Sequence, residues 1–468
     1  MSKTKIVATI GPASSTPDVF RELLRAGLTV ARVNFSHGNH NQHMETIAML
    51  RRIADDEEKV LAILGDLQGP KIRLGLFDTV PLKANQEVSF SNDPDDPDHL
   101  HLPHIELFDS LSAGSRMIIG DGEMELEVVS NDGKVLRCIS LYDGDLKARK
   151  GINTPGTSLS IPSITEKDRT DLEFMCQFRL DYVALSFVRS ADDIHELNGL
   201  MEGHGYVMPI VAKIEKFEAM ENLEAIAAVS DGLMVARGDL GLDLPTHQLP
   251  MLQKRIINVA NTNGIPVITA TQMLASMEHN PRPTRAEASD IANAILDGSD
   301  AIMLSNETAV GKYPVKAVET MRKIAENTEN QFPYDLWRRK RREINALDFV
   351  ADAISAAACT LAERIDARVI VTSTISGYTA KQIARHRPST KIYASSPLPK
   401  TQRELALVWG VECVLMSQTH STDEMIDKSL KAIKNIDFSV GDQIVITGGV
   451  PFSKPGLTNF IQIHSIEE

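Results

Sequence analysis

IPVITATQMLASMEHNPRPTRAEASDIANAILDGSDAIMLS, residues 265–305, contains a strand pattern, a helix pattern and a second strand pattern in succession. The segment begins and ends with short apolar, β-branched runs, which are typical of buried strands. Residues 285–298 between them are amphipathic, with the capping-box spacing of Thr284 and Glu287 at the start and Gly298 at the end. The stretch therefore predicts one β/α unit.

The same alternation of strand and helix patterns extends to the N-terminus. Further strand patterns lie at residues 5–11, 29–36, 60–66, 181–187, 209–215 and 232–239. With the two strands above, they give eight β/α units, a number that favours a closed parallel barrel over an open sheet. The predicted fold class is α/β, built on a (β/α)8 TIM barrel.

Two regions depart from this repeat. Residues 71–161 show turn signals around short alternating runs, which predict a small β-barrel lid domain inserted at the barrel mouth. After a charged segment, strand and helix patterns resume and predict a separate C-terminal α/β regulatory domain. The expected boundaries are residues 1–70 and 162–335 for the barrel, 71–161 for the lid and 345–468 for the last domain.

Composition narrows the function classes. Acidic residues outnumber basic ones by 63 to 49, giving a net charge of −14 that disfavours binding to nucleic acid or an anionic membrane. No apolar stretch approaches a membrane span, and no signal peptide is visible, so we expect a cytoplasmic protein. The cysteines show no CxxC spacing, and we expect small core residues at Cys138, Cys176, Cys359 and Cys413.

Polar side chains stand at the predicted strand ends, where a barrel gathers its chemistry. They are Arg32, Asn34, Ser36, Asp66, Lys213, Glu215, Arg237, Asp239, Thr271, Ser305 and Glu307. Singly, each has a structural alternative: Lys213 with Glu215 and Arg32 with Asp66 could be ion pairs, and Thr271 could bond to backbone. Together they favour an active site, because desolvating so many charges costs several kcal/mol per ion without a ligand.

The residue types indicate the chemistry. Glu215 and Asp239 offer the hard oxygen ligands that suit Mg²⁺ or Mn²⁺. Lys213, with Arg32 and Arg73 nearby, suits a substrate rich in phosphate and carboxylate oxygens. Phosphoryl transfer or enolate chemistry is therefore expected. The sequence contains neither a Walker A loop nor a kinase Gly-rich loop.

Several motifs resemble signatures of the pyruvate kinase family, in the family's order and over essentially the whole chain. They are TKIVATIGPAS, ARVNFSHG, GDLQGPKIR, ARKGINTPG, VAKIE, MVARGDLG and the long stretch from 268 to 318. The resemblance implies transfer of a phosphoryl group from phosphoenolpyruvate to ADP, which gives pyruvate and ATP. It also implies a mobile lid, an effector site in the last domain and a homotetramer.

The resemblance assigns roles to individual residues. Lys213 would neutralise charge on the phosphoryl oxygens and the developing enolate, Arg32 would grip the phosphoryl group, and Thr271 would lie near the carbon that is protonated. Backbone amides around Gly238 and Asp239 would hold the substrate carboxylate. Glu215 and Asp239 would bind the divalent metal. The monovalent-cation position corresponds to Asn34, Ser36, Asp66 and the Leu67 carbonyl, and the nucleotide contacts to Asn34, His37, Arg73 and Lys150.

The stretch DLQGPKIR departs from the common DTKGPEIR by placing Lys71 where many members have glutamate. In the family, that glutamate accompanies dependence on K⁺. We hypothesise that the Lys71 ammonium is a built-in cation beside Asp66, so that K⁺ is not required; the alternative is an exposed hinge lysine. Asn306 and Ser160 also replace residues common in the family.

A hydroxyl-rich segment in the last domain predicts an effector site. Its residues, before or at a helix start, are Thr372, Ser373, Thr374, Ser376, Gly377 and Thr379. Hydroxyls and free amides there could hold the phosphate of a sugar phosphate or AMP, or could simply cap the helix.

Two other functions remain as alternatives. A metal-dependent barrel lyase acting through pyruvate enolate would leave the lid and Lys150 without a role. A non-enzymatic regulator would be expected to lack Lys213, Glu215 or Asp239, and all three are present.

Overall fold

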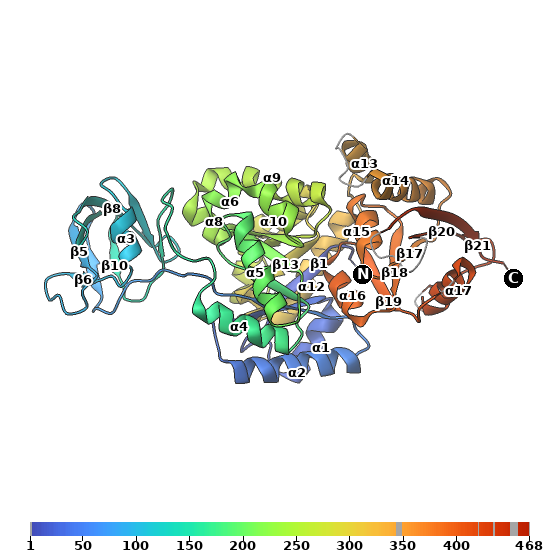
Figure 1. Cartoon of the computed structure of the whole chain (residues 1–468), viewed down its shortest axis with the longest axis horizontal. Helices are drawn as coiled ribbons and strands as arrows, with labels where there is room; N and C mark the ends of the chain where they lie inside the picture. The colour runs from blue at the N-terminus through green and yellow to red at the C-terminus, as the bar shows by residue number, and fades with distance from the viewer. Residues whose placement is uncertain (1, 343–348, 420, 434–435, 450–456, 468) are drawn as a thin grey trace.

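A computed structural model of the chain describes residues 2–342, 349–419, 421–433, 436–449 and 457–467. Figure 1 shows three bodies in a row along the longest axis of the molecule. A barrel lies in the centre, the inserted β domain at one end and the C-terminal α/β domain at the other. The lid and the last domain therefore contact opposite sides of the barrel.

Within the described residues, eight parallel strands close the barrel, and each lies beside the next barrel strand in the sequence. They are β1 (Lys5–Thr9), β2 (Val30–Asn34), β3 (Ala62–Asp66), β12 (Tyr182–Leu185), β13 (Ile210–Ile214), β14 (Gly232–Ala236), β15 (Val267–Ala270) and β16 (Ala301–Leu304). All lie where the alternation predicts them, so the barrel is confirmed. The register sets Asn34 and Ala184 level with Asp66, which brings neighbouring strand ends to one mouth.

Helices surround the barrel and bury their apolar faces against the strands. They are α1 (Pro17–Ala26), α2 (His40–Asp56), α4 (Glu166–Gln177), α5 (Ala191–Gly203), α6 (Phe217–Glu221), α7 (Leu223–Val229), α8 (Arg237–Asp243), α9 (Leu249–Asn263), α10 (Arg285–Asp297), α11 (Asn306–Ala309) and α12 (Pro314–Glu329). Helix α10 has the predicted capping box between Thr284 and Glu287 and ends at Gly298, whose φ of +106° is the left-handed conformation that glycine tolerates. No described helix is long and apolar enough to cross a membrane.

The lid leaves the barrel after β3 and returns at α4. Its elements are β4 (Val80–Leu82), β5 (Glu87–Ser91), β6 (Leu100–His101), α3 (Ile105–Ser110), β7 (Arg116–Ile119), β8 (Met124–Asn131), β9 (Val135–Ser140), β10 (Gly144–Leu146) and β11 (Ile152–Asn153). In the described chain they form a six-stranded sheet and a two-stranded ribbon of β4 and β10. Both contribute to one apolar core, to which Phe90 and Leu126 belong.

The C-terminal domain contains a sheet in the order β19, β18, β17, β20, β21, with only β21 antiparallel among these strands. Its elements are α13 (Tyr334–Arg342), α14 (Phe349–Arg364), β17 (Val369–Ser373), α15 (Tyr378–Arg385), β18 (Lys391–Ser396), α16 (Pro399–Glu404), β19 (Val411–Leu415), α17 (Thr422–Ala432), β20 (Gln443–Gly448) and β21 (Phe460–Ser465). The predicted domain start at residue 345 lies outside the described residues. The cysteines are free and buried, as expected, at Cys138, Cys176, Cys359 and Cys413.

The C-terminal domain packs against the base of the barrel. Leu407 joins the apolar cluster inside the barrel. At the start of β12, the fully buried carboxylate of Asp181 lies 2.7 Å from Nε of Arg403. The hydroxyl of Tyr182 donates a 2.7 Å hydrogen bond to the Glu404 carbonyl. Helix α16 is therefore joined directly to the beginning of one barrel strand.

Candidate active site

Three charged side chains form an ionic cluster at the barrel mouth. Arg32 Nε lies 2.6 Å from one oxygen of Asp66, and Lys213 Nζ lies 3.2 Å from the other. Burial alone would raise the pKa of Asp66, but the charges of Lys213 and Arg32 hold it below its ordinary value. Burial would also lower the pKa of Lys213, yet the nearby carboxylates raise it above its ordinary value. Lys213 is therefore an ammonium at neutral pH, suited to neutralising charge.

Glu215 is the second carboxylate beside Lys213. Its Oε1 lies 3.1 Å from Lys213 Nζ, but in a direction that makes no hydrogen bond, and this buried oxygen has no hydrogen-bond partner among the described residues. Its Oε2 accepts a 2.8 Å hydrogen bond from the Phe187 amide. Burial, opposed by the Lys213 charge and aided by Asp239, raises the pKa of Glu215. An ionised oxygen in this position suits a hard cation, because a metal ion would compensate its desolvation.

Asp239 and Thr271 come from the next two strand ends. Asp239 lies in the first turn of α8 and lines the space beneath the lid. Thr271 has a φ of +66°, a costly conformation for a β-branched residue and one typical of functional sites. Its hydroxyl donates to the Ala270 carbonyl at 2.7 Å and accepts from the Gly238 amide at 2.9 Å. The predicted backbone-bonded alternative for Thr271 is thus present, and it fixes the position of the hydroxyl.

Two other strand-end groups support loops. The Arg237 guanidinium lies 2.6 Å from Asp290 and donates to the Thr271 carbonyl at 2.6 Å. The buried Glu307 accepts hydrogen bonds from the Leu274 and Ser305 amides at 3.0 and 2.7 Å. The charges of Arg237 and Glu307 are therefore used within the protein, and they hold the loops that carry Thr271.

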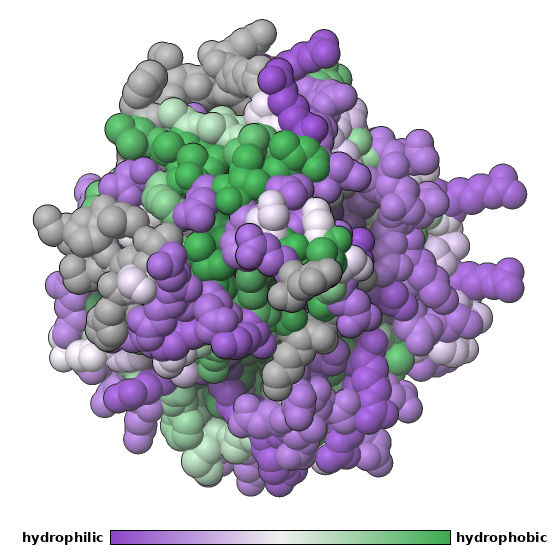
Figure 2. All heavy atoms as spheres, turned by 90° about the vertical axis from the view of Figure 1, so that its right-hand side faces the viewer, coloured by the Kyte–Doolittle hydropathy of each residue, from purple (hydrophilic) through white to green (hydrophobic). Residues whose placement is uncertain are grey.

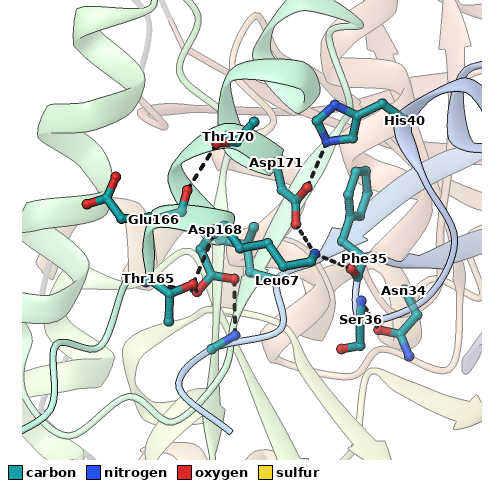
Figure 3. Close-up of polar contacts among 12 residues, drawn as sticks. Asn34, Phe35, Ser36, His40, Leu67, Thr165, Glu166, Asp168, Thr170 and Asp171 are labelled. Atoms are coloured by element: carbon teal, nitrogen blue, oxygen red, sulfur yellow. Dashed lines mark hydrogen bonds and ion pairs between the residues drawn. The ribbon is translucent and has the colours of Figure 1, made fainter.

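Asn34 ends β2, and the loop that follows carries Ser36 and His37. Asn34 Oδ1 accepts a 3.1 Å hydrogen bond from the Ser36 amide (Figure 3). Lys167 in α4 donates to the carbonyl between them, that of Phe35, at 2.6 Å, and forms a 2.6 Å ion pair with Asp171. The other oxygen of Asp171 lies 2.7 Å from Nε2 of His40, toward which it points in Figure 3. The first turns of α4 thus hold this loop in place.

The same helix turn holds the hinge that leads into the lid. Asp168 accepts a 3.1 Å hydrogen bond from the Gly69 amide and a 2.6 Å hydrogen bond from the Thr165 hydroxyl. Gly69 has a φ of +68°, and a Cβ there would lie 2.8 Å from the Phe187 ring and 3.0 Å from Ser186 Cβ. Glycine is therefore required where the chain turns from β3 into the lid.

A cavity of about 150 Å³ separates the lid from α8. Its charged lining residues are Lys71, Arg73, Asp121, Arg149, Lys150 and Asp239. Lys150 forms a 2.7 Å ion pair with Glu123 of the lid. Lys71 is exposed, and no hydrogen bond or ion pair joins it to Asp66 in the described part of the chain. Ser160 and Asn306 are also exposed, and nothing in the structure explains these two departures.

The ends of the first and fourth strands, which are not among the predicted site residues, also contribute to the site. Thr9 accepts a 2.9 Å hydrogen bond from Arg32 Nη1. Ser186, directly after β12, accepts a 2.6 Å hydrogen bond from Lys213 Nζ and donates a 2.8 Å hydrogen bond to the Leu67 carbonyl. The signal that identifies the other residues, a polar group at a strand end, would also have found Thr9 and Ser186.

A closed parallel barrel with lysine, arginine and paired carboxylates at its mouth defines a class of enzymes that act on phosphate and carboxylate groups. A family model described as "Pyruvate kinase, barrel domain" matches residues 1–318. A second, "Pyruvate kinase, alpha/beta domain", matches residues 352–464. The chain belongs to the pyruvate kinase family, as its motifs predicted.

Individual proteins similar to this chain are also pyruvate kinases. The chain is 43% identical to pyruvate kinase of Geobacillus stearothermophilus, over 100% of this chain and 81% of that protein. It is 40% identical to pyruvate kinase of Clostridium perfringens over the full length of both. A crystal structure of a pyruvate kinase from Cryptosporidium parvum matches with a TM-score of 0.94 and 33% identity, covering 99% of this chain and 96% of the other. The family consists of phosphotransferases, and the lyase alternative is not supported.

Proposed function

We propose that the chain transfers the phosphoryl group of phosphoenolpyruvate to ADP at the barrel mouth, with Lys213 as its central catalytic residue. The observation that carries this assignment is the buried ammonium of Lys213 between Asp66 and Glu215. Cleaving the phosphoryl group from phosphoenolpyruvate leaves negative charge on the enolate oxygen. A fixed ammonium stabilises that charge as it develops, without reorganisation of solvent.

Glu215 and Asp239 would hold Mg²⁺ or Mn²⁺, and the buried Oε1 of Glu215 without a hydrogen bond supports this choice. When bound, the metal supplies Lewis acidity and positive charge beside the phosphoryl oxygens. Arg32, fixed by Asp66 and Thr9, presents its remaining donors to the phosphoryl group.

Binding of the substrate carboxylate and delivery of the final proton involve the next strand end. The amides at the start of α8, around Gly238 and Asp239, would hold the carboxylate. The Gly238 amide already donates to Thr271, so Asp239 offers the freer of the two amides. The hydroxyl of Thr271, fixed by two hydrogen bonds, would lie near the enolate carbon that accepts the proton.

ADP would bind between the lid and the loop after β2. Lys150 and Arg73 line the lid cavity, while Asn34 ends β2 and His37 lies in the loop that follows. The exposed ion pair of Lys150 with Glu123 costs little to break, so nucleotide phosphates can replace the Glu123 carboxylate. We also infer the predicted domain boundaries near residues 70 and 162, where the chain leaves and re-enters the barrel.

We further propose that Lys71 makes the enzyme independent of K⁺. The side chain lies in the cleft, and its tether would let it approach Asn34, Ser36, Asp66 and the Leu67 carbonyl when the lid closes. Lys71→Glu should therefore create a requirement for K⁺ that the unchanged enzyme lacks. Equal stimulation of both proteins by K⁺ would refute the proposal for Lys71 while leaving the enzyme assignment intact.

An allosteric role for the C-terminal domain rests on the turn that precedes α15. Thr374 Oγ1 accepts a 2.9 Å hydrogen bond from the amide of Gly377, whose φ is +80°. The Thr372 hydroxyl is buried without a hydrogen-bond partner among the described residues. Together with Ser373, Ser376 and Thr379, this turn offers hydroxyls and amides to the phosphate of a sugar phosphate or AMP. Activity measured with each compound in turn tests the site.

We infer a homotetramer in the cytoplasm. Figure 2 shows apolar side chains gathered on the outer face of the C-terminal domain. Exposed apolar residues of this domain include Val350, Leu457 and Ile463, and β21 pairs on one side only among the described strands. A second copy of the chain could cover both features. Light scattering should give four times the chain mass of 51.4 kDa.

The decisive experiment is the formation of pyruvate from phosphoenolpyruvate and ADP with Mg²⁺. It should be run once with K⁺ and once with tetramethylammonium as the monovalent cation. Equal activity in both supports the complete proposal, and activity only with K⁺ removes the role of Lys71. Folded protein that forms no pyruvate under either condition, with candidate effectors present, would refute the assigned function.

A further inference from the structure

Ser186 is buried at the mouth, with 2% of its surface exposed. Its hydroxyl makes the shortest of the three polar contacts of Lys213, at 2.6 Å, whereas Asp66 and Glu215 lie at 3.2 and 3.1 Å. The hydroxyl proton is directed to the Leu67 carbonyl, 2.8 Å away. Because a serine hydroxyl has one proton, its lone pairs are left to face the ammonium.

The surrounding backbone leaves Ser186 little freedom. A Cβ on Gly69 would lie only 3.0 Å from Ser186 Cβ, so the hinge glycine packs closely against it. The next residue, Phe187, has a φ of +54° and donates its amide to Glu215. The turn after β12 therefore fixes the Ser186 hydroxyl and one oxygen of Glu215 at the same time.

We propose that Ser186 is a positioning residue for Lys213. Two carboxylates flank the ammonium, and Coulomb attraction alone would draw it onto the buried oxygen of Glu215. The hydroxyl offers a neutral third contact that takes the hydrogen bond which the ammonium does not make to this oxygen. Lys213 then stays directed at the substrate and Glu215 stays available to the divalent metal. This inference deepens the proposed function, because it rests on the catalytic role of Lys213.

The test compares Ser186→Ala with Ser299→Ala. Ser299 is a matched control: it is 1% exposed and forms a 2.7 Å hydroxyl pair with Thr269, but it precedes β16 at the base of the barrel. We expect kcat of Ser186→Ala to fall about tenfold, with the KM for phosphoenolpyruvate unchanged within twofold. Mn²⁺ affinity, measured by electron paramagnetic resonance without substrates, should weaken at least threefold. Ser299→Ala should change neither quantity.

Combining Ser186→Ala with Lys213→Met tests whether the loss of kcat in Ser186→Ala depends on Lys213. In Lys213→Met protein, adding Ser186→Ala should alter the residual kcat by less than twofold and leave Mn²⁺ affinity unchanged. An unaltered kcat in the single variant, an equal loss in Ser299→Ala, or a full additional loss in the Lys213→Met background would each overturn the inference.

If Ser186→Ala does not fold, Ser186→Cys keeps the shape but provides a weaker acceptor, and an intermediate loss of kcat is expected; full activity overturns the proposal. High activity of Lys213→Met alone would refute the catalytic role of the lysine. Inactive Lys213→Met together with fully active Ser186→Ala would refute only the role of Ser186.

Discussion

Replacing Lys213 with methionine removes one buried positive charge and keeps most of the side-chain volume. The side chain is 11% exposed, so water cannot substitute for the ammonium during the reaction. Removal of one neutral oxyanion donor from an enzyme costs about 10²–10³ in kcat. Because Lys213 is charged and would serve both the phosphoryl and the enolate oxygens, we expect kcat to fall at least about 10³-fold, or about 4 kcal/mol.

The assay is steady-state pyruvate formation, accompanied by circular dichroism to verify folding. Folding should survive, because Asp66 keeps its 2.6 Å contact with Arg32. Lys216→Met is the matched control, since Lys216 lies three residues further on and pairs with Asp243 at 2.9 Å. Its kcat should stay within about threefold. Folded Lys213→Met with a kcat within tenfold of the unchanged enzyme would refute the electrostatic reasoning.

Two further variants test the domain contact and the loop. The buried Lys5 donates to the Val411 carbonyl, and burial lowers its pKa from 10.5 to about 8, which corresponds to about 3 kcal/mol. Between pH 8 and 10.5 the unfolded chain binds a proton at Lys5 that the folded chain does not, so the free energy of unfolding should rise with pH over this range. The Lys5→Met variant should lack this rise, and its thermal unfolding at pH 7 should occur at a higher temperature than that of the unchanged protein. A lower unfolding temperature at pH 7 would contradict the cost of burying the Lys5 charge. Lys167→Met removes the hydrogen bond to the Phe35 carbonyl and should raise the KM for ADP about threefold, whereas Arg169→Met on the same helix should leave it unchanged. Equal KM values for the two variants would show that Lys167 does not hold the loop after β2.

The barrel could be predicted from sequence because each of its β/α units leaves its own pattern in a short stretch of residues. Alternation of apolar strands with amphipathic helices is visible within one repeat, such as residues 265–305, and eight repeats leave few other architectures. The alternation of Lys213 and Glu215 likewise places both side chains on one strand face. Their meeting with Asp66 at the mouth follows from parallel register, and the structure contains it.

Hydrogen-bond partners could not be predicted in the same way, because they depend on side-chain directions across distant segments. Arg237 stands at a strand end like Arg32, yet it pairs with Asp290 in the helix after β15. Lys71 is two residues beyond the hinge glycine, and only the path of the lid decides whether its ammonium faces Asp66 or the open cleft. The contact of Ser186 with Lys213 spans 27 residues and requires the exact turn after β12.

The attachment of helix α16 to strand β12 links the two ends of the barrel. The strand is held at its base by Arg403 and the Glu404 carbonyl, and Ser186 follows directly at its tip. At about 3.3 Å per residue, these four strand residues span about 13 Å. The contacts of α16 and the hydroxyl beside Lys213 therefore lie at the two ends of the same strand. One short strand thus connects the C-terminal domain to the surroundings of the Lys213 ammonium, although the two lie at opposite ends of the barrel.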